Sequence, residues 1–309
     1  MKRWIVGLLL PMALLGSSAF PAGAHPLVRN GPLVFASDRS GKLEIWRSGA
    51  AGKHATQLTH TPGRFESIFS DWSPDGHWIA FDSDRRGTVQ IFLMDATGGQ
   101  VRQVTHGGGF NGDPTFTPDG THLLFERAPS SGCCSNIYSI RVDGTRLQQL
   151  THFTAETFPG EPEQSPDGRW IAFMRTRPGG DTVAIWLMHP DGSGLHAITR
   201  QSLDAGHPSW SPDASRIIFN DKFTQPVGDI FTIRPDGTGL HRLTNVAGRG
   251  LADYRPDYSP DGTRIVFSHI GPAGVPSLWV MNRDGSIKHR ITDPRDGGAF
   301  AARWGPAAS

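Results

Sequence analysis

Asp113, Glu161 and His207 occupy the same place in three successive repeats of this chain, each directly before a proline. Two carboxylates and an imidazole are side chains that a divalent cation accepts as ligands. The same place holds Arg255 in the next repeat, and Asp257 follows it by two residues. We therefore identify Asp113, Glu161, His207, Arg255 and Asp257 as the candidate ligand-binding set. The first three could ligate a metal, or they could form a solvated polar rim.

Motifs of known catalytic and phosphate-binding sites are missing from the sequence. It contains no Gly-x-Ser-x-Gly nucleophile motif, no His-Glu-x-x-His zinc motif and no phosphate-binding glycine loop. The 38 glycines occur mainly at turns that the repeat requires. We therefore assign no catalytic residue, and no cofactor beyond the candidate divalent cation.

A repeat of 44 to 48 residues positions the candidate set. Its first marker is a Ser/Thr-Pro-Asp-Gly/Ala turn, found at residues 73–76, 117–120, 165–168, 211–214 and 259–262. Its second marker is a threonine that closes an amphipathic segment, found at Thr59, Thr105, Thr151, Thr199, Thr244 and Thr292. This period is typical of a propeller blade or a solenoid unit.

The unit from residue 71 to 105 predicts a four-stranded antiparallel meander. After the turn, residues 79–81 form a continuously apolar segment, which is typical of a strand covered on both faces. Residues 89–94 and 101–105 predict the third and the outer strand. An aromatic residue precedes the turn at Trp72, Phe116, Trp210, Tyr258 and Trp304, whereas the fourth unit has Gln164. We expect these rings to fill the wedges between neighbouring sheets.

The two ends of the repeat region predict a closed ring. The first unit begins at a second strand, residues 33–35, and no inner strand precedes it. Residues 301–306 resemble an inner strand and its turn, with no further strands after them. The last segment therefore completes the first unit and removes the free sheet edges. The predicted fold is all-β: a six-bladed β-propeller of four-stranded blades, closed by the C-terminal strand in blade 1.

The motifs Ser-Pro-Asp-Gly, Ile-Ala-Phe, Ser-Asp-Arg-x-Gly and Leu-Thr resemble the WD40-like repeats of the TolB-type propeller family. Similar propellers occur in prolyl-oligopeptidase-like enzymes and in oligogalacturonate lyase. The resemblance covers residues 31–306 and implies the fold. TolB carries an additional α/β domain before its propeller, which has no counterpart here. The resemblance to TolB implies a peptidoglycan-associated lipoprotein as a type of partner.

Residues 1–24 have the three parts of a secretory signal: Lys2 and Arg3, an apolar run, and small residues ending in Ala24. We expect residues 25–309 to form the mature propeller, periplasmic or secreted, with no transmembrane segment. The 30 basic and 29 acidic residues are spread through the repeats, which argues against a nucleic-acid partner. The adjacent pair Cys133 and Cys134 could form a vicinal disulfide or remain an exposed loop pair.

Ring propellers bind ligands at the mouth of the central channel, which the loops between blades surround. We therefore expect a monomeric, non-catalytic binding module for a protein or another envelope component. The alternative is a metal-assisted lyase or hydrolase that acts on a carbohydrate or a small molecule at the same mouth. Retention of a metal at Asp113, Glu161 and His207 would favour the enzyme.

Overall fold

The structure is a computed structural model that describes residues 30–307, except 108, 131–133, 155–156, 177–179, 226–227 and 247–248. The predicted signal peptide, residues 1–24, and Cys133 lie outside the described residues. The described chain forms 24 strands and two short 3-10 helices, η1 (Gln201–Leu203) and η2 (Pro294–Asp296). None of its helices is long and apolar enough to cross a membrane.

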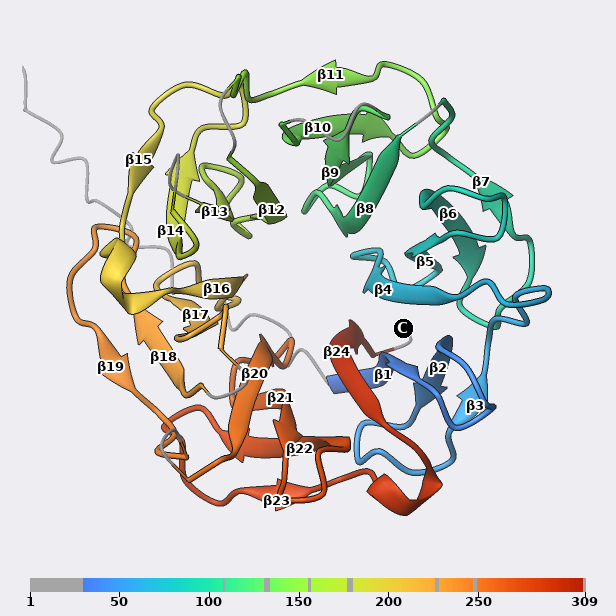
Figure 1. The fold of residues 1–309 in the computed structure, drawn as a ribbon, viewed down its shortest axis with the longest axis vertical. Coiled ribbons are helices and arrows are strands. Elements are labelled where there is room, and N and C mark those ends of the chain that lie inside the picture. The colour runs from blue at the N-terminus through green and yellow to red at the C-terminus, as the bar shows by residue number, and fades with distance from the viewer. Residues whose placement is uncertain are drawn as a thin grey trace, which may run out of the picture.

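Six four-stranded antiparallel sheets are arranged as blades around a central axis (Figure 1). Blade 1 contains, from the axis outwards, β24 (Ala299–Pro306), β1 (Asn30–Ser37), β2 (Glu44–Ser48) and β3 (Thr56–Gln57). Blade 2 contains β4 (Ser67–Trp72), β5 (Trp78–Ser83), β6 (Gln90–Asp95) and β7 (Arg102–Gln103). Blade 3 contains β8 (Phe110–Phe116), β9 (His122–Ala128), β10 (Asn136–Arg141) and β11 (Gln148–Gln149).

The other three blades follow the same order. Blade 4 contains β12 (Pro159–Gln164), β13 (Ile171–Thr176), β14 (Val183–Met188) and β15 (His196–Ala197). Blade 5 contains β16 (Gly206–Trp210), β17 (Ile217–Asn220), β18 (Ile230–Ile233) and β19 (His241–Arg242). Blade 6 contains β20 (Ala252–Tyr258), β21 (Arg264–Ile270), β22 (Pro276–Asn282) and β23 (His289–Arg290).

The C-terminal strand closes the ring, as the sequence predicts. β24 pairs antiparallel with β1, with Leu33 opposite Trp304 and Val34 opposite Arg303. In Figure 1 the red β24 lies beside the blue β1 at the axis. The Trp304 side chain is buried and packs with Leu33 and Phe35 of blade 1 and with residues of blade 6. The fold is therefore the predicted six-bladed propeller.

The recurring threonines explain why each outer strand is short. The sequence predicts an outer strand over residues 101–105, but β7 contains only Arg102 and Gln103. The Thr105 hydroxyl accepts a hydrogen bond from the backbone N–H of Ile91 at 2.9 Å, so a side chain replaces the next ladder bond. The other five threonines accept the corresponding bond from the third strand at 2.8–2.9 Å. Each threonine therefore ends its outer strand.

The Ser-Pro-Asp-Gly turns need a left-handed residue at their fourth position. In blade 2 the Gly76 N–H donates to the Ser73 carbonyl at 2.9 Å, and Gly76 has a φ of 72°. Four of the five turns place glycine there, because glycine adopts this conformation without steric cost. The fifth turn has Ala214, with a φ of 54°. At this end of the inner strands, the left-handed turn position is therefore mostly occupied by glycine.

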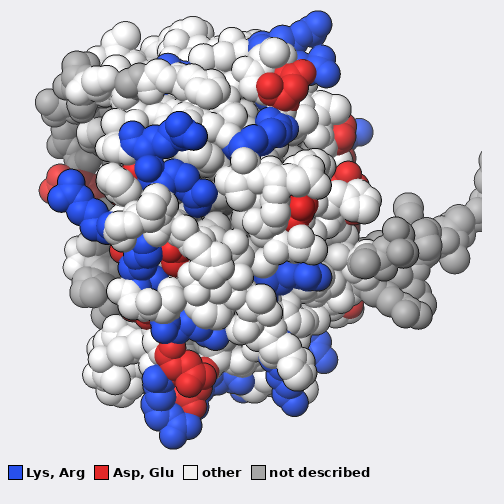
Figure 2. All heavy atoms as spheres, turned by 90° about the vertical axis from the view of Figure 1, so that its right-hand side faces the viewer, with Lys and Arg blue, Asp and Glu red and all other residues white. Residues whose placement is uncertain are grey.

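The outer surface carries charges of both signs. Figure 2 shows Lys and Arg side chains on one edge of the disc, separated by uncharged surface and by Asp and Glu. A phosphate backbone requires a continuous basic track. In this view the basic groups stand in small clusters, with Asp and Glu among them.

Candidate functional site

A β-bulge in each of their inner strands places the candidate residues around the central channel, at what the sequence predicts to be its mouth. The register of the inner strands β8, β12, β16 and β20 shifts where these residues stand. Asp113, Glu161, His207, Arg255 and Ala301 all have left-handed backbones there, with φ between 49° and 54°. Together with Phe69 of blade 2, they line one cavity of about 40 Å³. This volume can hold a few water molecules or the tip of a side chain.

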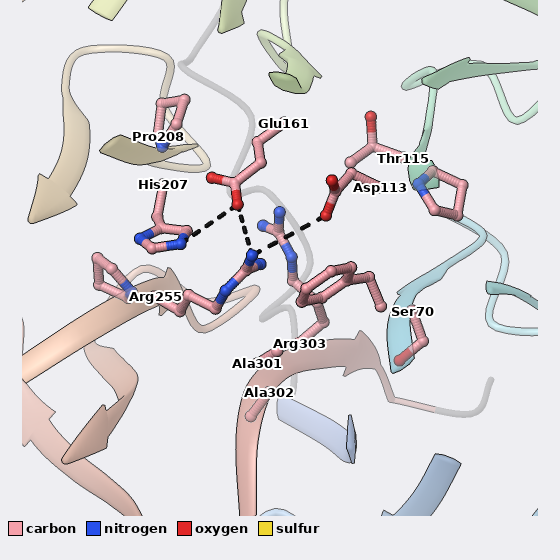
Figure 3. Close-up of a pocket in the computed structure, with 13 residues that line it drawn as sticks. Ser70, Asp113, Thr115, Glu161, His207, Pro208, Arg255, Ala301, Ala302 and Arg303 are labelled. Atoms are coloured by element: carbon pink, nitrogen blue, oxygen red, sulfur yellow. Dashed lines mark hydrogen bonds and ion pairs between the residues drawn. The ribbon is translucent and has the colours of Figure 1, made fainter. Parts of the chain in front are cut away.

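Arg255 and His207 converge on one oxygen of Glu161 (Figure 3). Arg255 Nη2 lies 2.5 Å from Glu161 Oε1, and His207 Nε2 lies 3.2 Å from the same atom. Asp113 Oδ1 lies 4.0 Å from Arg255 Nη2. The Arg255 guanidinium also lies 4.0 Å from the centre of the Phe69 ring, which is a cation-π distance. The structure thus brings together the four predicted residues Asp113, Glu161, His207 and Arg255.

Two side chains of second strands accept hydrogen bonds from the backbone of the bulges. Asp82 accepts hydrogen bonds from the backbone N–H of Phe69 at 3.1 Å and of Asp113 at 3.0 Å. Asn220 Oδ1 accepts from the backbone N–H of Arg255 at 3.3 Å and lies 2.6 Å from His207 Nδ1. Asp82 therefore links the bulges of blades 2 and 3, and Asn220 links the bulges of blades 5 and 6.

These contacts fix which atom of His207 faces Glu161. Because Asn220 Oδ1 already accepts from a backbone N–H, we assign the hydrogen of the ring to Nδ1. Nε2 then faces the Glu161 carboxyl as an acceptor. Burial lowers the pKa of His207 well below its usual range, and burial raises the pKa of Glu161. Both shifts disfavour the charged forms, so burial opposes an imidazolium–carboxylate pair between His207 and Glu161.

A second ring of polar residues lies two positions further along the inner strands and braces the blades. Arg303 Nη1 lies 2.6 Å from Glu163 Oε2 and 3.1 Å from Asp257 Oδ1. Ser209 donates to Glu163 at 3.2 Å and to Asp257 at 3.0 Å. Arg303 thus connects blade 1 to blades 4 and 6.

The carboxylates of this ring also bind the backbone of the next blade. Asp71, Glu163 and Asp257 accept hydrogen bonds from the N–H groups of Phe116, Trp210 and Trp304 at 2.8, 2.8 and 2.9 Å. Asp257, a predicted ligand-binding residue, is therefore engaged in this brace, and it is not among the residues that line the cavity. Its observed contacts serve the assembly of the ring.

Sequence reasoning did not select Asp82, Asn220 or Arg303. Asp82 and Asn220 stand near the end of their second strands, directly after the buried Phe81 and Phe219. A polar residue at the end of a doubly covered strand is the signal that could have found them, because a buried polar group needs a partner. Arg303 could have been noticed as the one basic residue in a ring position otherwise filled by acids and hydroxyls.

The predicted metal ligands are arranged around an arginine. The Arg255 guanidinium lies between Glu161 and Asp113, where a cation would otherwise balance their charges. Across the described ranges, no three or more His, Cys, Asp or Glu side chains are grouped so as to hold a metal ion. Binding a divalent cation at Asp113, Glu161 and His207 would require Arg255 to move away.

Carboxyl groups outnumber basic groups around the channel, and burial raises their pKa. Burial raises the pKa of Asp71 to about 7 and that of Glu126 to about 8. Burial, followed by repulsion from Glu161, raises the pKa of Asp113, and burial with repulsion from Asp113 raises that of Asp82. Part of this cluster therefore takes up protons near neutral pH.

We expect the protein to become more stable as the pH falls from 8.5 to 6.5. A carboxyl with a raised pKa binds its proton first in the folded state, so the folded state gains stability between the folded value, about 7 to 8, and the unfolded value, about 4. Each such proton contributes about 1.4 kcal/mol per pH unit. Below about pH 6.5 the neutral His207 opposes this gain, because the unfolded chain protonates its histidines.

Calorimetric melting at the two pH values measures this effect. The Asp113→Asn variant removes one of the titrating groups and should flatten the pH dependence. A melting temperature that is equal at both pH values, or higher at pH 8.5, would contradict the assigned shifts.

Comparisons with known proteins agree with the fold. The family model described as the TolB beta propeller domain matches residues 29–131 and 108–308. Among solved structures, TolB from Acinetobacter baumannii superposes with a TM-score of 0.75 at 20% identity, over 89% of this chain and 66% of that chain. The putative TolB from Agrobacterium tumefaciens gives a TM-score of 0.66 at 23% identity, over 91% and 99% of the two chains.

A third similar structure is an oligogalacturonate lyase in complex with manganese, with a TM-score of 0.57 at 15% identity, over 86% of this chain and 74% of that chain. No curated protein matches the sequence. At these identities the structural likenesses show the fold alone. This chain spans 66% of the length of the Acinetobacter protein.

Proposed function

Since this chain belongs to the TolB β-propeller family, we propose that it is an exported binding module that holds part of an envelope protein at its channel mouth. In this proposal residues 1–24 direct export and residues 25–309 form the working propeller. The side chains of Asp113, Glu161, His207 and Arg255 contact the partner.

The observation that carries this proposal is the choice of residues at the left-handed bulge positions. A non-glycine residue in this conformation costs about 1–2 kcal/mol. At the opposite end of the inner strands the chain uses glycine in four of five left-handed turn positions. At the mouth it uses Asp, Glu, His, Arg and Ala instead, and never glycine. A strained backbone that retains varied polar side chains supports a role for those side chains in binding.

The chemistry of the mouth suits a polypeptide. The cavity presents a carboxylate, an imidazole and a guanidinium beside the Phe69 ring, so it can pair with polar groups of either sign and with an apolar group. Glu161 Oε2 is buried and has no hydrogen-bond partner among the described residues. A partner N–H or hydroxyl group could satisfy this oxygen. The small volume limits the inserted part to a side-chain tip or a chain end.

The double variant Asp113→Asn/Arg255→Gln tests the proposal, because it removes one charge of each sign from the mouth. The matched control is Asp213→Asn/Arg283→Gln, which removes an exposed ion pair of the same residue types with an N–O distance of 3.1 Å. Each protein captures partners from an envelope extract, and quantitative mass spectrometry identifies them. We expect recovery of the partner to fall about tenfold or more for the mouth variant only.

Equal recovery by the wild type and the mouth variant, with both folded as judged by melting, would place binding elsewhere. Loss of recovery in the control as well would show that the effect is not specific to the mouth.

A further inference from the structure

In four blades an arginine guanidinium stacks on the aromatic ring of the third strand. Its Cζ lies 4.8–5.6 Å from the centre of that ring. The pairs are Arg39 with Trp46, Arg85 with Phe92, Arg127 with Tyr138 and Arg175 with Trp186. A stacked guanidinium keeps its N–H groups in its own plane, where they can donate to acceptors around its edge. The groups that meet this edge differ between the blades.

The stacked arginines of blades 1 and 2 have partners at this edge. Arg39 Nε donates to the Ser37 hydroxyl at 3.0 Å. Arg85 Nε donates to the Ser83 hydroxyl at 3.1 Å. Burial lowers the pKa of both guanidinium groups, and nearby carboxylates oppose this shift. Each of these arginines is therefore balanced by groups of its own chain.

The stacked arginine of blade 4 lacks such partners. Arg175 Nε is buried and has no hydrogen-bond partner among the described residues. None of the ion pairs between described residues includes Arg175. Burial lowers the pKa of its guanidinium, and no carboxylate opposes this shift. A buried N–H donor without an acceptor is unfavourable, so this group is suited to an acceptor from outside.

A second N–H donor without an acceptor lies beside it. Trp186 Nε1 is also buried and has no hydrogen-bond partner among the described residues. Trp46 Nε1 of blade 1 is in the same condition, although the arginine stacked on that ring is bonded. The unbonded guanidinium is therefore the feature that distinguishes blade 4 from blade 1.

Two aromatic rings hold Arg175 in place. Its Cζ lies 3.8 Å from the centre of the Phe153 ring and 4.8 Å from that of the Trp186 ring. Phe153 is fixed in turn, because its N–H donates to Asn136 Oδ1 at 2.8 Å and its carbonyl accepts from Asn136 Nδ2 at 3.3 Å. Arg175 is half-buried, so a ligand can reach the guanidinium from solvent. The side chain is thus ordered before any ligand arrives, which lowers the entropic cost of binding.

We propose that Arg175 forms an anion site on blade 4 that binds a carboxylate of a protein partner. A guanidinium and a carboxylate match in plane and spacing and can form two parallel hydrogen bonds. One guanidinium balances one negative charge, and the rings of Phe153 and Trp186 suit the apolar carbon that carries a carboxylate.

This site is separate from the cavity at the channel mouth. Arg175 pairs with Pro159, two residues before Glu161, so it lies at the mouth end of blade 4. It is not among the residues that line the cavity. The proposal therefore stands whether or not the mouth itself binds a partner.

NMR of the ¹⁵N-labelled protein tests the site with small probes. N-acetylglycine offers a terminal carboxylate, the methylamide of N-acetylaspartate offers a side-chain carboxylate, and N-acetylglycinamide is the control without a carboxylate. We expect the Arg175 Nε–H signal to shift with at least one carboxylate, with a dissociation constant on the order of 1 mM, and not with the amide. The tighter carboxylate shows whether the partner offers a chain end or an acidic side chain.

Two internal controls and two variants sharpen the test. The Nε–H signals of Arg39 and Arg85 should shift little, because hydroxyl groups already accept from them. Arg175→Lys keeps the charge but removes the planar fork. Followed through the Trp186 indole N–H signal, its affinity for the carboxylate should fall about fivefold or more. Arg85→Lys makes the same substitution in another stacked arginine and should leave this affinity unchanged.

Four results would overturn the proposal. They are no shift of the Arg175 signal with either carboxylate, an equal shift with the amide, unchanged affinity in Arg175→Lys, and tighter binding of inorganic phosphate than of both carboxylates. The last result would show that the site prefers another class of anion.

Discussion

Deletion of residues 299–309 should remove most of the stability of the protein. The deletion takes away β24, which completes blade 1, and it exposes the edge of β1 along the channel. It also removes Trp304, which is 8% exposed and packs between blades 1 and 6. Truncation of a buried tryptophan alone costs about 3–5 kcal/mol, whereas whole domains are stable by about 5–15 kcal/mol.

Thermal melting and size-exclusion chromatography measure this loss. We expect no cooperative melting near the wild-type temperature, and aggregation through the unpaired edge. Trp304→Ala is the milder variant. It should still fold, with a clearly lower Tm. Deletion of residues 307–309, which follow β24, is the control. A wild-type melting curve for the 299–309 deletion would show that the ring does not need this strand.

Replacement of Arg303 by methionine should have the second largest effect. The guanidinium balances Glu163 and Asp257, and all three are largely shielded from water, with side-chain exposures of 23%, 16% and 12%. Removal of one partner from a buried ion pair costs about 3–5 kcal/mol, because it leaves uncompensated buried charge. Arg303→Met leaves two facing carboxylates that share only the Ser209 hydroxyl.

Combination with Glu163→Gln and Asp257→Asn isolates the charge effect. The triple variant should recover most of the Tm that Arg303→Met loses, because neutral amides no longer repel. The single variant should also lose less stability at pH 5 than at pH 8, since burial raises the pKa of Glu163 and allows it to protonate. Arg283→Met, in an exposed pair, should cost at most about 1 kcal/mol. No rescue by the triple variant would mean that Arg303 acts through packing alone.

The repeat carries enough information to predict the fold. Its period sets the blades, and the residues around Trp304 can only be an inner strand, which is where β24 lies. The spacing also brings Asp113, Glu161, His207 and Arg255 to one opening, because equivalent residues of a ring must face the same axis.

The contacts within the site could not be predicted in the same way. Spacing places Asp113, Glu161 and His207 on neighbouring blades, yet the guanidinium of Arg255 comes from blade 6 to occupy the centre. The left-handed bulge residues themselves are not glycine, so their backbone conformation is not evident from the residue types at those positions. Asp82 and Asn220 act from the second strands, and their partners depend on how adjacent blades are set against each other.

The pairing of β1 with β24 also has a consequence for how the molecule is made. These two strands meet across roughly 270 residues of chain, and closing a loop of that length costs about 5 kcal/mol of entropy. The other five blades are each built from neighbouring strands and can form as the chain emerges. Among the described strands β24 is synthesised last, so the nascent propeller is an open arc until β24 has formed. The time between the first and the last strand is therefore when a chaperone would protect this protein most.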